Sequence, residues 1–419
     1  GSEMCIRDRV GTALVDTMRK TKSSVKQLFI PGMLFENMGL TYLGPVDGHN
    51  MRQMMKLFNE AKRVEGPVVV HVLTKKGRGY EPASAHPDRF HGTGPFDIKT
   101  GRVLQKKTVP GYTDVFSKAL VSLGEKNKKL TAITAAMPDG TGLVEFSRRF
   151  PDRFFDVGIA EEHAVSFAAG LALGGLVPVV AIYSSFLQRA VDQILHDVCM
   201  QKLHVIFAVD RAGLVGADGE THQGCFDLSY LSMMPNMTVL APKNDRELEE
   251  MLAFAVSFDG PIAIRYPRGS AHQGLREYQV PVEYGRSEII RKGKKIAVLG
   301  VGSMIPSCME ICKGLKDDGY DPTFVNARFV KPLDVDLLDE LAKDHSLFVT
   351  VEENVKSGGY GEHVSAYMEA CHPEIRVLSA AVWDRFVPQG NVESLRSRIG
   401  LGVEDIRQAI EDSEELREQ

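Results

Sequence analysis

Three apolar stretches between residues 154 and 210 each run directly into residues that can carry chemistry. The stretches are FFDVGIA, VPVVAIY and HVIFAVD, at residues 154–160, 177–183 and 204–210. Each is short and followed by a helical or glycine-rich segment, which is typical of a buried strand in a parallel sheet. Three consecutive strand ends are therefore expected to converge on one site.

The helices that follow the first two strands begin with polar or aromatic residues. Glu161 and Glu162 stand in the first turn after FFDVGIA, where acidic residues suit a helix N-terminus. On its own, Glu161 would be interpreted as a helix-start carboxylate. Tyr183 ends VPVVAIY, and Phe186 and Arg189 follow it three and six residues later. An aromatic face beside a guanidinium suits a flat heterocycle and an anionic substrate. A core phenylalanine and a surface ion pair are the structural alternative.

The third strand leads into RAGLVGADGETHQG, a long polar loop rich in glycine. This loop contains Arg211, Asp218, Glu220 and His222. Loops of this kind hold binding and catalytic residues more often than packing residues. The three segments together therefore predict one site that combines a carboxylate, an aromatic face, arginines and a histidine.

Length and composition are those of an intracellular enzyme. A chain of 419 residues with 43% hydrophobic residues can bury several cores and suggests two or three domains. A net charge of −5 gives no electrostatic case for a nucleic-acid partner. The six cysteines show no paired metal spacing and are interpreted as reduced thiols, which favours the cytoplasm. No apolar run approaches the length of a membrane span.

Strand-like and helical patterns alternate through two long regions. The first contains LTAITAA, FFDVG, VPVVAIY, HVIFAVD, MTVLAP and PIAIRY, and the second contains KKIAVLGVGSM, DPTFVNARF, SLFVTVEEN and IRVLSAAV. This alternation predicts an α/β protein with two doubly wound parallel-sheet domains. An amphipathic stretch at 51–64 and the strand PVVVHVL precede them. Residues 1–10 are interpreted as a tag or leader outside the fold.

Several motifs resemble those of the transketolase family of thiamine diphosphate-dependent enzymes, in particular the members that make 1-deoxy-D-xylulose 5-phosphate. The resemblance runs from about Gly11 to the C-terminus. It is carried by GPVDGHN, TKKGRGY, FFDVGIAEEHAVSFAAGLA, YSSFLQRAVDQ, DRAGLVGADGETHQG, IRYPRG, RFVKPLD and VEEN. Any one of these strings would be weak alone, but together they are specific.

The resemblance implies three domains and an overall reaction. It makes residues 11–108 the tail of a diphosphate-binding domain, 109–278 a pyrimidine-binding domain and 279–419 a transketolase C-terminal domain. The implied reaction condenses pyruvate with glyceraldehyde 3-phosphate and releases CO2, in a cytoplasmic homodimer that uses thiamine diphosphate and Mg²⁺. The product is a precursor of isoprenoids, thiamine and pyridoxal.

The resemblance also implies a role for each candidate residue. Glu161 would activate the cofactor through its pyrimidine nitrogen, Phe186 would stack on the pyrimidine, and Tyr80 would lie against the cofactor. His222 and His91 would act at the reacting end, with His222 as a proton shuttle. The substrate-binding residues implied are Tyr183, Arg189, Arg211, Asp218 and Arg268, of which Arg189 and Arg268 would bind the acceptor phosphate. His163, His196 and His204 are interpreted as packed or surface residues.

One family motif does not occur in this sequence. The family binds the diphosphate through Mg²⁺ with a GDG motif and a downstream Asn, whereas the nearest strings here are VDGH, PDGTG and ADGE. We therefore expect no metal ligands in this chain, the front part of the N-terminal domain to be lacking, and the chain to be inactive alone. Two alternatives stay open. They are a β-type subunit of a 2-oxoacid dehydrogenase and a non-catalytic transketolase-like dimerisation module.

Overall fold

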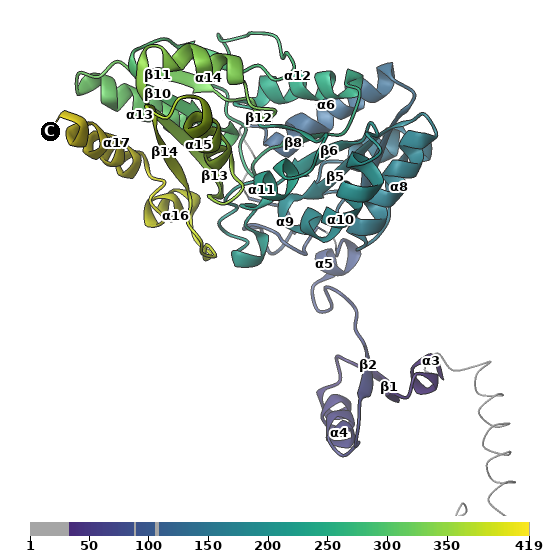
Figure 1. The fold of residues 1–419 in the computed structure, drawn as a ribbon. Helices are drawn as coiled ribbons and strands as arrows, with labels where there is room; N and C mark the ends of the chain where they lie inside the picture. The colour runs from purple at the N-terminus through teal and green to yellow at the C-terminus, as the bar shows by residue number, and fades with distance from the viewer. Residues whose placement is uncertain (1–32, 88, 105–108, 419) are drawn as a thin grey trace, which may run out of the picture. The chain divides into compact units, whose positions relative to one another are not determined.

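The computed structural model describes residues 33–87, 89–104 and 109–418 (Figure 1). It divides into two compact units, Gly1–Lys107 and Thr108–Gln419. The proposed leader at residues 1–10 lies outside the described residues. Among the described residues, no helix is long and apolar enough to cross a membrane.

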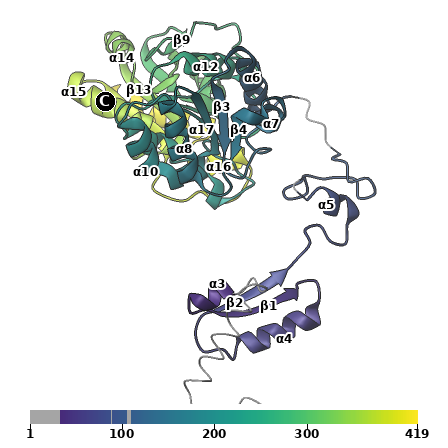
Figure 2. The same cartoon turned by 90° about the vertical axis from the view of Figure 1, so that its right-hand side faces the viewer.

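The first unit is built on a small parallel sheet. Strands β1 (Thr41–Asp47) and β2 (Val68–Leu73) pair in parallel, and α4 (Met51–Ala61) connects them and contacts both (Figure 2). The amphipathic stretch predicted at 51–64 is confirmed as α4. The described part of this unit also contains two short helices, α3 (Met33–Asn37) and α5 (Glu81–Ala85).

The second unit begins with a seven-stranded sheet in the order β12-β7-β8-β6-β5-β3-β4. Its strands are β3 (Leu130–Thr134), β4 (Phe154–Asp156), β5 (Val177–Tyr183), β6 (Ile206–Asp210), β7 (Thr238–Leu240), β8 (Ile262–Arg265) and β12 (Phe329–Lys331). All neighbours are parallel except β12 and β7. Its helices are α6 (Tyr112–Lys126), α7 (Val144–Arg149), α8 (Glu161–Leu173), α9 (Ser184–Leu187), α10 (Val191–Gln193), α11 (Asp227–Ser232) and α12 (Asp245–Ser257).

Alternating residues of these strands fill two different hydrophobic cores. Val179 and Ala181 pack with side chains of α6 and α12, whereas Val180 and Ile182 pack with those of α8. Successive side chains of a strand point to opposite faces of its sheet. A strand that is apolar at every position is therefore covered on both faces, as the uninterrupted run VPVVAIY predicts.

A five-stranded sheet follows in the order β14-β13-β10-β11-β9. Its strands are β9 (Glu288–Arg291), β10 (Lys295–Gly300), β11 (Thr323–Asn326), β13 (His345–Val355) and β14 (Arg376–Val382). Its helices are α13 (Ile305–Asp317), α14 (Val335–Ala342), α15 (Tyr360–Cys371), α16 (Val392–Arg398) and α17 (Val403–Glu418). One face joins the core that also covers α8, and the other packs on α13, α16 and α17.

Both sheets are mixed rather than purely parallel, because each ends in an antiparallel edge strand. β9 pairs with β11, and β12 pairs with β7. β12 follows directly after β11 in the chain but joins the other sheet. The predicted fold class is confirmed, with the correction that two edge strands are antiparallel. The predicted domain boundaries at 108/109 and 278/279 stay a proposal.

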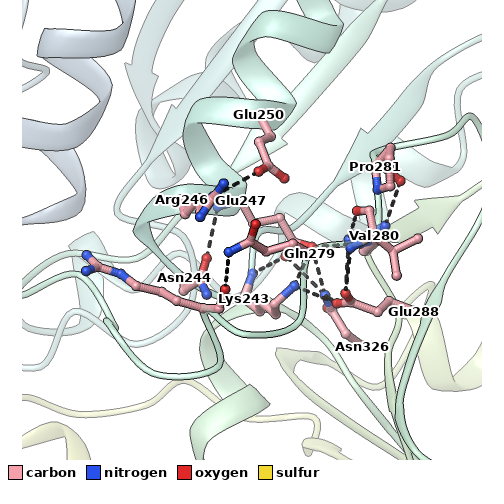
Figure 3. Close-up of polar contacts among 12 residues, drawn as sticks. Lys243, Asn244, Arg246, Glu247, Glu250, Gln279, Val280, Pro281, Glu288 and Asn326 are labelled. Atoms are coloured by element: carbon pink, nitrogen blue, oxygen red, sulfur yellow. Dashed lines mark hydrogen bonds and ion pairs between the residues drawn. The ribbon is translucent and has the colours of Figure 1, made fainter.

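A buried group of four charges lies where the chain passes between the sheets (Figure 3). Lys243, Glu247, Glu288 and Arg328 are each at most 2% exposed. Lys243 Nζ lies 2.5 Å from Glu288 Oε2, and Arg328 Nε lies 2.7 Å from Glu247 Oε1. Asn326 Nδ2 also donates to Glu247 Oε1, over 2.9 Å. We call these five residues the charge cluster.

The charge cluster joins elements from both sheets. Glu247 belongs to α12, which covers the first sheet, whereas Glu288 belongs to β9 of the second. Arg328 lies between β11 and β12 and also donates to the carbonyl oxygens of Val280 and Pro281. Two positive and two negative charges cancel, so each buried charge has a partner.

We expect Glu247→Gln to reduce the free energy of unfolding by about 3–5 kcal/mol, because it leaves a buried positive charge uncompensated. Urea denaturation measures this loss. Glu250→Gln on the same helix is the matched control. Glu250 pairs with Arg246 at the surface, and such a pair contributes about 0–1 kcal/mol. Equal losses in the two variants would contradict the structural role of the charge cluster.

Candidate active site

The carboxyl ends of β5, β6 and β8 bring the predicted residues to one edge of the first sheet. Tyr183, the last residue of β5, is the register partner of Asp210, the last residue of β6. Arg265 ends β8 beside Val209, and Arg268 follows three residues later. The strand ends therefore converge as the sequence predicts.

Glu161 is a buried carboxylate at the N-terminus of α8. It is 2% exposed, and its Oε1 accepts a hydrogen bond of 2.5 Å from Arg189 Nη1. Its Oε2 is buried and has no partner among the described residues. Since a buried acceptor without a partner is costly, this oxygen is available to a ligand that brings an N–H or O–H donor.

Aromatic rings line the space beside this carboxylate. The rings of Tyr183 and Phe186 stack with their centroids 5.6 Å apart, and the His222 ring meets Phe186 edge-on at 5.3 Å. Arg189 Cζ lies 5.1 Å from the centroid of the Phe186 ring. These contacts connect residues of α9, η2 (Gln188–Ala190) and η4 (Glu220–His222).

Two arginines converge on one carboxylate at the other end of the aromatic group. Arg211 Nη1 lies 2.6 Å from Asp218 Oδ2, and Arg268 Nη1 lies 3.0 Å from Asp218 Oδ1. The Arg211 guanidinium also lies 4.0 Å over the Tyr183 ring. The structure therefore groups Arg268 with Arg211, whereas Arg189 contacts Glu161.

Burial changes the acidity of two groups here. Burial raises the pKa of Asp210 to about 7, although hydrogen bonds from Thr113 Oγ1 and the Arg211 amide oppose the rise. Burial also raises the pKa of Tyr183, against the attraction of Arg211. Near pH 7 the Asp210 carboxyl is therefore partly protonated, and the three site arginines contact two other carboxylates, Glu161 and Asp218.

The structure brings eight of the ten predicted site residues into one continuous group of contacts. The members are Glu161, Tyr183, Phe186, Arg189, Arg211, Asp218, His222 and, through Asp218, Arg268. The two predicted residues outside this group are Tyr80 and His91. Their individual roles stay predictions.

Tyr80 and His91 belong to the first unit. Tyr80 donates from its hydroxyl to the carbonyl oxygen of Ile98 over 2.8 Å, and its ring contacts Phe90 and Phe96. His91 is exposed. The roles proposed for these two residues stay predictions, because they concern a site in the other unit.

The three histidines interpreted from the sequence as packed or surface residues have ordinary surroundings. His163 and His196 are exposed, and His196 Nδ1 lies 2.9 Å from Asp192 Oδ1. His204 Nε2 lies 2.8 Å from the carbonyl oxygen of Ala255. Among the described residues, no group of three or more His, Cys, Asp or Glu side chains could hold a metal ion.

Sequence reasoning missed two buried polar residues beside the site, Asp210 and Gln223. Asp210 ends the run HVIFAVD, so a polar residue at the end of an apolar strand was an available signal. Gln223 stands within the quoted string THQG, but a glutamine in a polar loop carries no sign that it is buried. Its 4% exposure is known only from the fold.

Three family models match this chain. They are the transketolase pyrimidine-binding domain over residues 109–273, the transketolase C-terminal domain over 285–406 and 1-deoxy-D-xylulose-5-phosphate synthase over 1–74. A solved structure described as a split gene transketolase, inactive beta4 tetramer, is 31% identical, with a TM-score of 0.64. The match covers 97% of that chain and 72% of this one. The chain belongs to the transketolase family.

The curated relatives of this chain share one name within the family. The 1-deoxy-D-xylulose-5-phosphate synthase of Lachnoclostridium phytofermentans is 54% identical over 95% of this chain, and that of Natranaerobius thermophilus is 50% identical over 95%. The chain spans 64% and 63% of the length of these two relatives. The transketolase of Campylobacter jejuni, 16% identical with a TM-score of 0.62 over 91% of this chain, has a similar fold.

Proposed function

We propose that this chain supplies the pyrimidine-binding and C-terminal parts of a thiamine diphosphate-dependent transferase. The proposed reaction joins pyruvate to glyceraldehyde 3-phosphate, with release of CO2 and formation of 1-deoxy-D-xylulose 5-phosphate. The carrying observation is Glu161, a buried carboxylate with one oxygen on Arg189 and the other without a partner among the described residues. The names of the curated relatives support the choice of product.

The site residues suit the pyrimidine end of the cofactor. Glu161 Oε2 would accept a hydrogen bond from a ring nitrogen, and Phe186 would cover a ring face. The contact of Tyr80 with the cofactor stays a prediction. When bound, thiamine diphosphate supplies the carbon nucleophile and the electron sink that decarboxylation of a 2-oxoacid requires. Arg189 compensates the buried charge of Glu161, since Nη1 and Oε1 are in contact.

The histidines and Tyr183 would act on the substrates. His222, whose ring meets the edge of Phe186, would move a proton at the reacting end. The role of His91 at the reacting end stays a prediction. The hydroxyl of Tyr183 would donate to the acceptor, and the surrounding apolar strand ends would exclude water.

The acceptor phosphate requires cations, and we propose that Arg211 and Arg268 hold it. Both guanidiniums now contact Asp218, so they already converge on one anionic group. A phosphate would take the place of this carboxylate. The resemblance implied that Arg189 binds the phosphate as well. That role stays a prediction, and the kinetic comparison of the arginine variants below tests it.

The match of residues 1–74 to the synthase model favours this function over a β-type dehydrogenase subunit, whose resemblance would begin near residue 109. The contacts among the site residues favour it over a non-catalytic module, because Arg189, Arg211 and Arg268 all meet a carboxylate within the site. We also propose a cytoplasmic homodimer. Free thiols at the five described cysteines and the exposed apolar Ile159 and Leu173 support it.

Glu161→Ala in the full-length polypeptide should abolish turnover while the chain stays folded, because no other carboxylate in this group has a free buried oxygen. Pyruvate consumption and circular dichroism measure the two effects. Glu162→Ala is the matched control, since Glu162 is the next residue of the helix and is exposed. Loss of turnover in the control and not in Glu161→Ala would reverse the assignment.

Replacing Arg211 or Arg268 by Ala should raise the KM for glyceraldehyde 3-phosphate far more than the KM for pyruvate. A lost charged hydrogen bond costs about 1.5–3 kcal/mol, roughly a ten- to hundredfold effect. Steady-state kinetics with each substrate varied measure it. Arg148→Ala, which removes an exposed arginine of α7, is the control. If the KM for glyceraldehyde 3-phosphate rose in Arg189→Ala but not in the Arg211 or Arg268 variant, Arg189 would be the phosphate-binding residue instead.

The chain by itself should bind thiamine diphosphate weakly and consume no pyruvate, because its sequence has no GDG motif for the Mg²⁺-bound diphosphate. We propose that Mg²⁺ ligands lie in a front part of the N-terminal domain. Calorimetric titration with thiamine diphosphate and Mg²⁺ tests this, before and after that part is added. Tight Mg²⁺-dependent binding by the chain alone would show that it holds a diphosphate site of its own.

A further inference from the structure

The loop that carries Asp218 and His222 is closed at its base by two backbone hydrogen bonds. We call residues 211–224 the site loop. The amide of Gly213 donates to the carbonyl oxygen of Gly224, and the amide of Gly224 donates back to Gly213, both over 2.7 Å. These bonds fix where the loop begins and ends. They do not determine where its tip, with Asp218 and His222, points.

Contacts from the second sheet and its following segment hold the site loop. We call residues 387–391, which precede α16, the supporting segment. Leu214 and Cys225 pack in the hydrophobic core that covers α13, α16 and α17, and Val387 lies in the same core. The amide of Gly390 donates to the carbonyl oxygen of Gly216 over 3.3 Å.

Gln223 connects the two segments through both ends of its side-chain amide. Its Oε1 accepts hydrogen bonds from the amides of Val215 and Gly216, at 2.8 and 3.4 Å. Its Nε2 donates to the carbonyl oxygens of Pro388 and Val387, at 3.1 and 3.5 Å. The oxygen therefore bonds to the site loop itself, and the nitrogen bonds to the supporting segment.

Two glycines let the site loop lie close to its neighbours, Gly213 beside β13 and Gly216 beside the supporting segment. A Cβ on Gly213 would lie 2.4 Å from Glu353 Oε2, and Glu353 is itself buried and bound by Arg396 and Ser303. A Cβ on Gly216 would lie 2.6 Å from the carbonyl oxygen of Gly390, at a φ of +69°. Neither contact leaves room for a side chain.

From these contacts we infer that Gln223 is a positioning residue, through which the supporting segment determines where Asp218 and His222 lie. The C-terminal part of the second unit would then contribute to acceptor binding without touching the substrate. The effect on acceptor binding rests on the function proposed above. The connection that Gln223 makes between the site loop and the supporting segment does not rest on that function, so it can be tested separately.

Gln223→Glu tests the connection, because a carboxylate keeps the acceptor and removes the donor. The carboxylate oxygen that replaces Nε2 would be repelled by the carbonyl oxygens of Val387 and Pro388. We expect amide hydrogen exchange of residues 214–222 to become about tenfold faster, with the amides of β5 and β6 unchanged. Gln389→Glu is the matched control, since it adds the same charge to an exposed residue of the supporting segment.

Gly216→Ala is a second variant that pushes the site loop off its support without a change of charge. It should produce the same selective increase in exchange. Site-loop exchange that is equal in Gln223→Glu and Gln389→Glu would overturn the inference. So would a uniform increase across β5, β6 and the site loop in both Gln223→Glu and Gly216→Ala, because that pattern indicates general destabilisation.

Titration with inorganic phosphate separates the inference from the proposed function. If the chain binds phosphate through Arg268, Gln223→Glu should change the affinity about tenfold and Gln389→Glu should not, because the site loop carries both Arg211, which would bind phosphate, and Asp218, which phosphate would replace. Phosphate binding that Arg268→Ala leaves unchanged would contradict the proposed function, while hydrogen exchange still decides the role of Gln223. Unchanged phosphate affinity in Gln223→Glu, with Arg268-dependent binding in the unmodified chain, would contradict the positioning role.

Discussion

The charge cluster between the two sheets is the interaction on which the arrangement of the second unit depends. Removing four charges from water is costly, and only mutual contact among them offsets that cost. Lys243 and Glu247 come from the first sheet's side, whereas Glu288 comes from the second. If the sheets separated by the width of a water molecule, Glu288 would lose its contact with Lys243, although Lys243 and Glu247 would stay paired on the first sheet's side. The cluster therefore selects one relative placement of the sheets.

That placement is also what the candidate site requires. The first sheet delivers Glu161, Tyr183 and Arg268 at strand ends, but Asp218 and His222 lie on a long loop with little structure of its own. Gln223 and Gly216 connect this loop to a segment that follows the second sheet. A fixed relation between the sheets thus becomes a fixed position for the loop. The edge strand β12, which follows β11 of the second sheet in the chain but pairs with β7 of the first, works in the same direction.

Local pattern was sufficient for most of the fold. The long apolar runs at β5 and β6 were recognisable because each is buried on both faces of a parallel sheet. β9 and β12 were not recognised as antiparallel edge strands, since they span four and three residues and their pairing depends on distant neighbours. The same limit applies within the site. Arg189 was foreseen as a site residue, but its contact with Glu161 joins residues 28 positions apart.

Charge balance explains how such a site can favour an anionic acceptor and stay stable without one. Arg189 is matched by Glu161, while Arg211 and Arg268 share the single carboxylate of Asp218. Burial raises the pKa of Asp210 to about 7, so this group carries only part of a negative charge near neutrality. The three arginines therefore still exceed the negative charge of Glu161, Asp218 and Asp210. Under the proposed function, a phosphate that replaced Asp218 would meet two guanidiniums already converging on one point, which lowers the cost of ordering them.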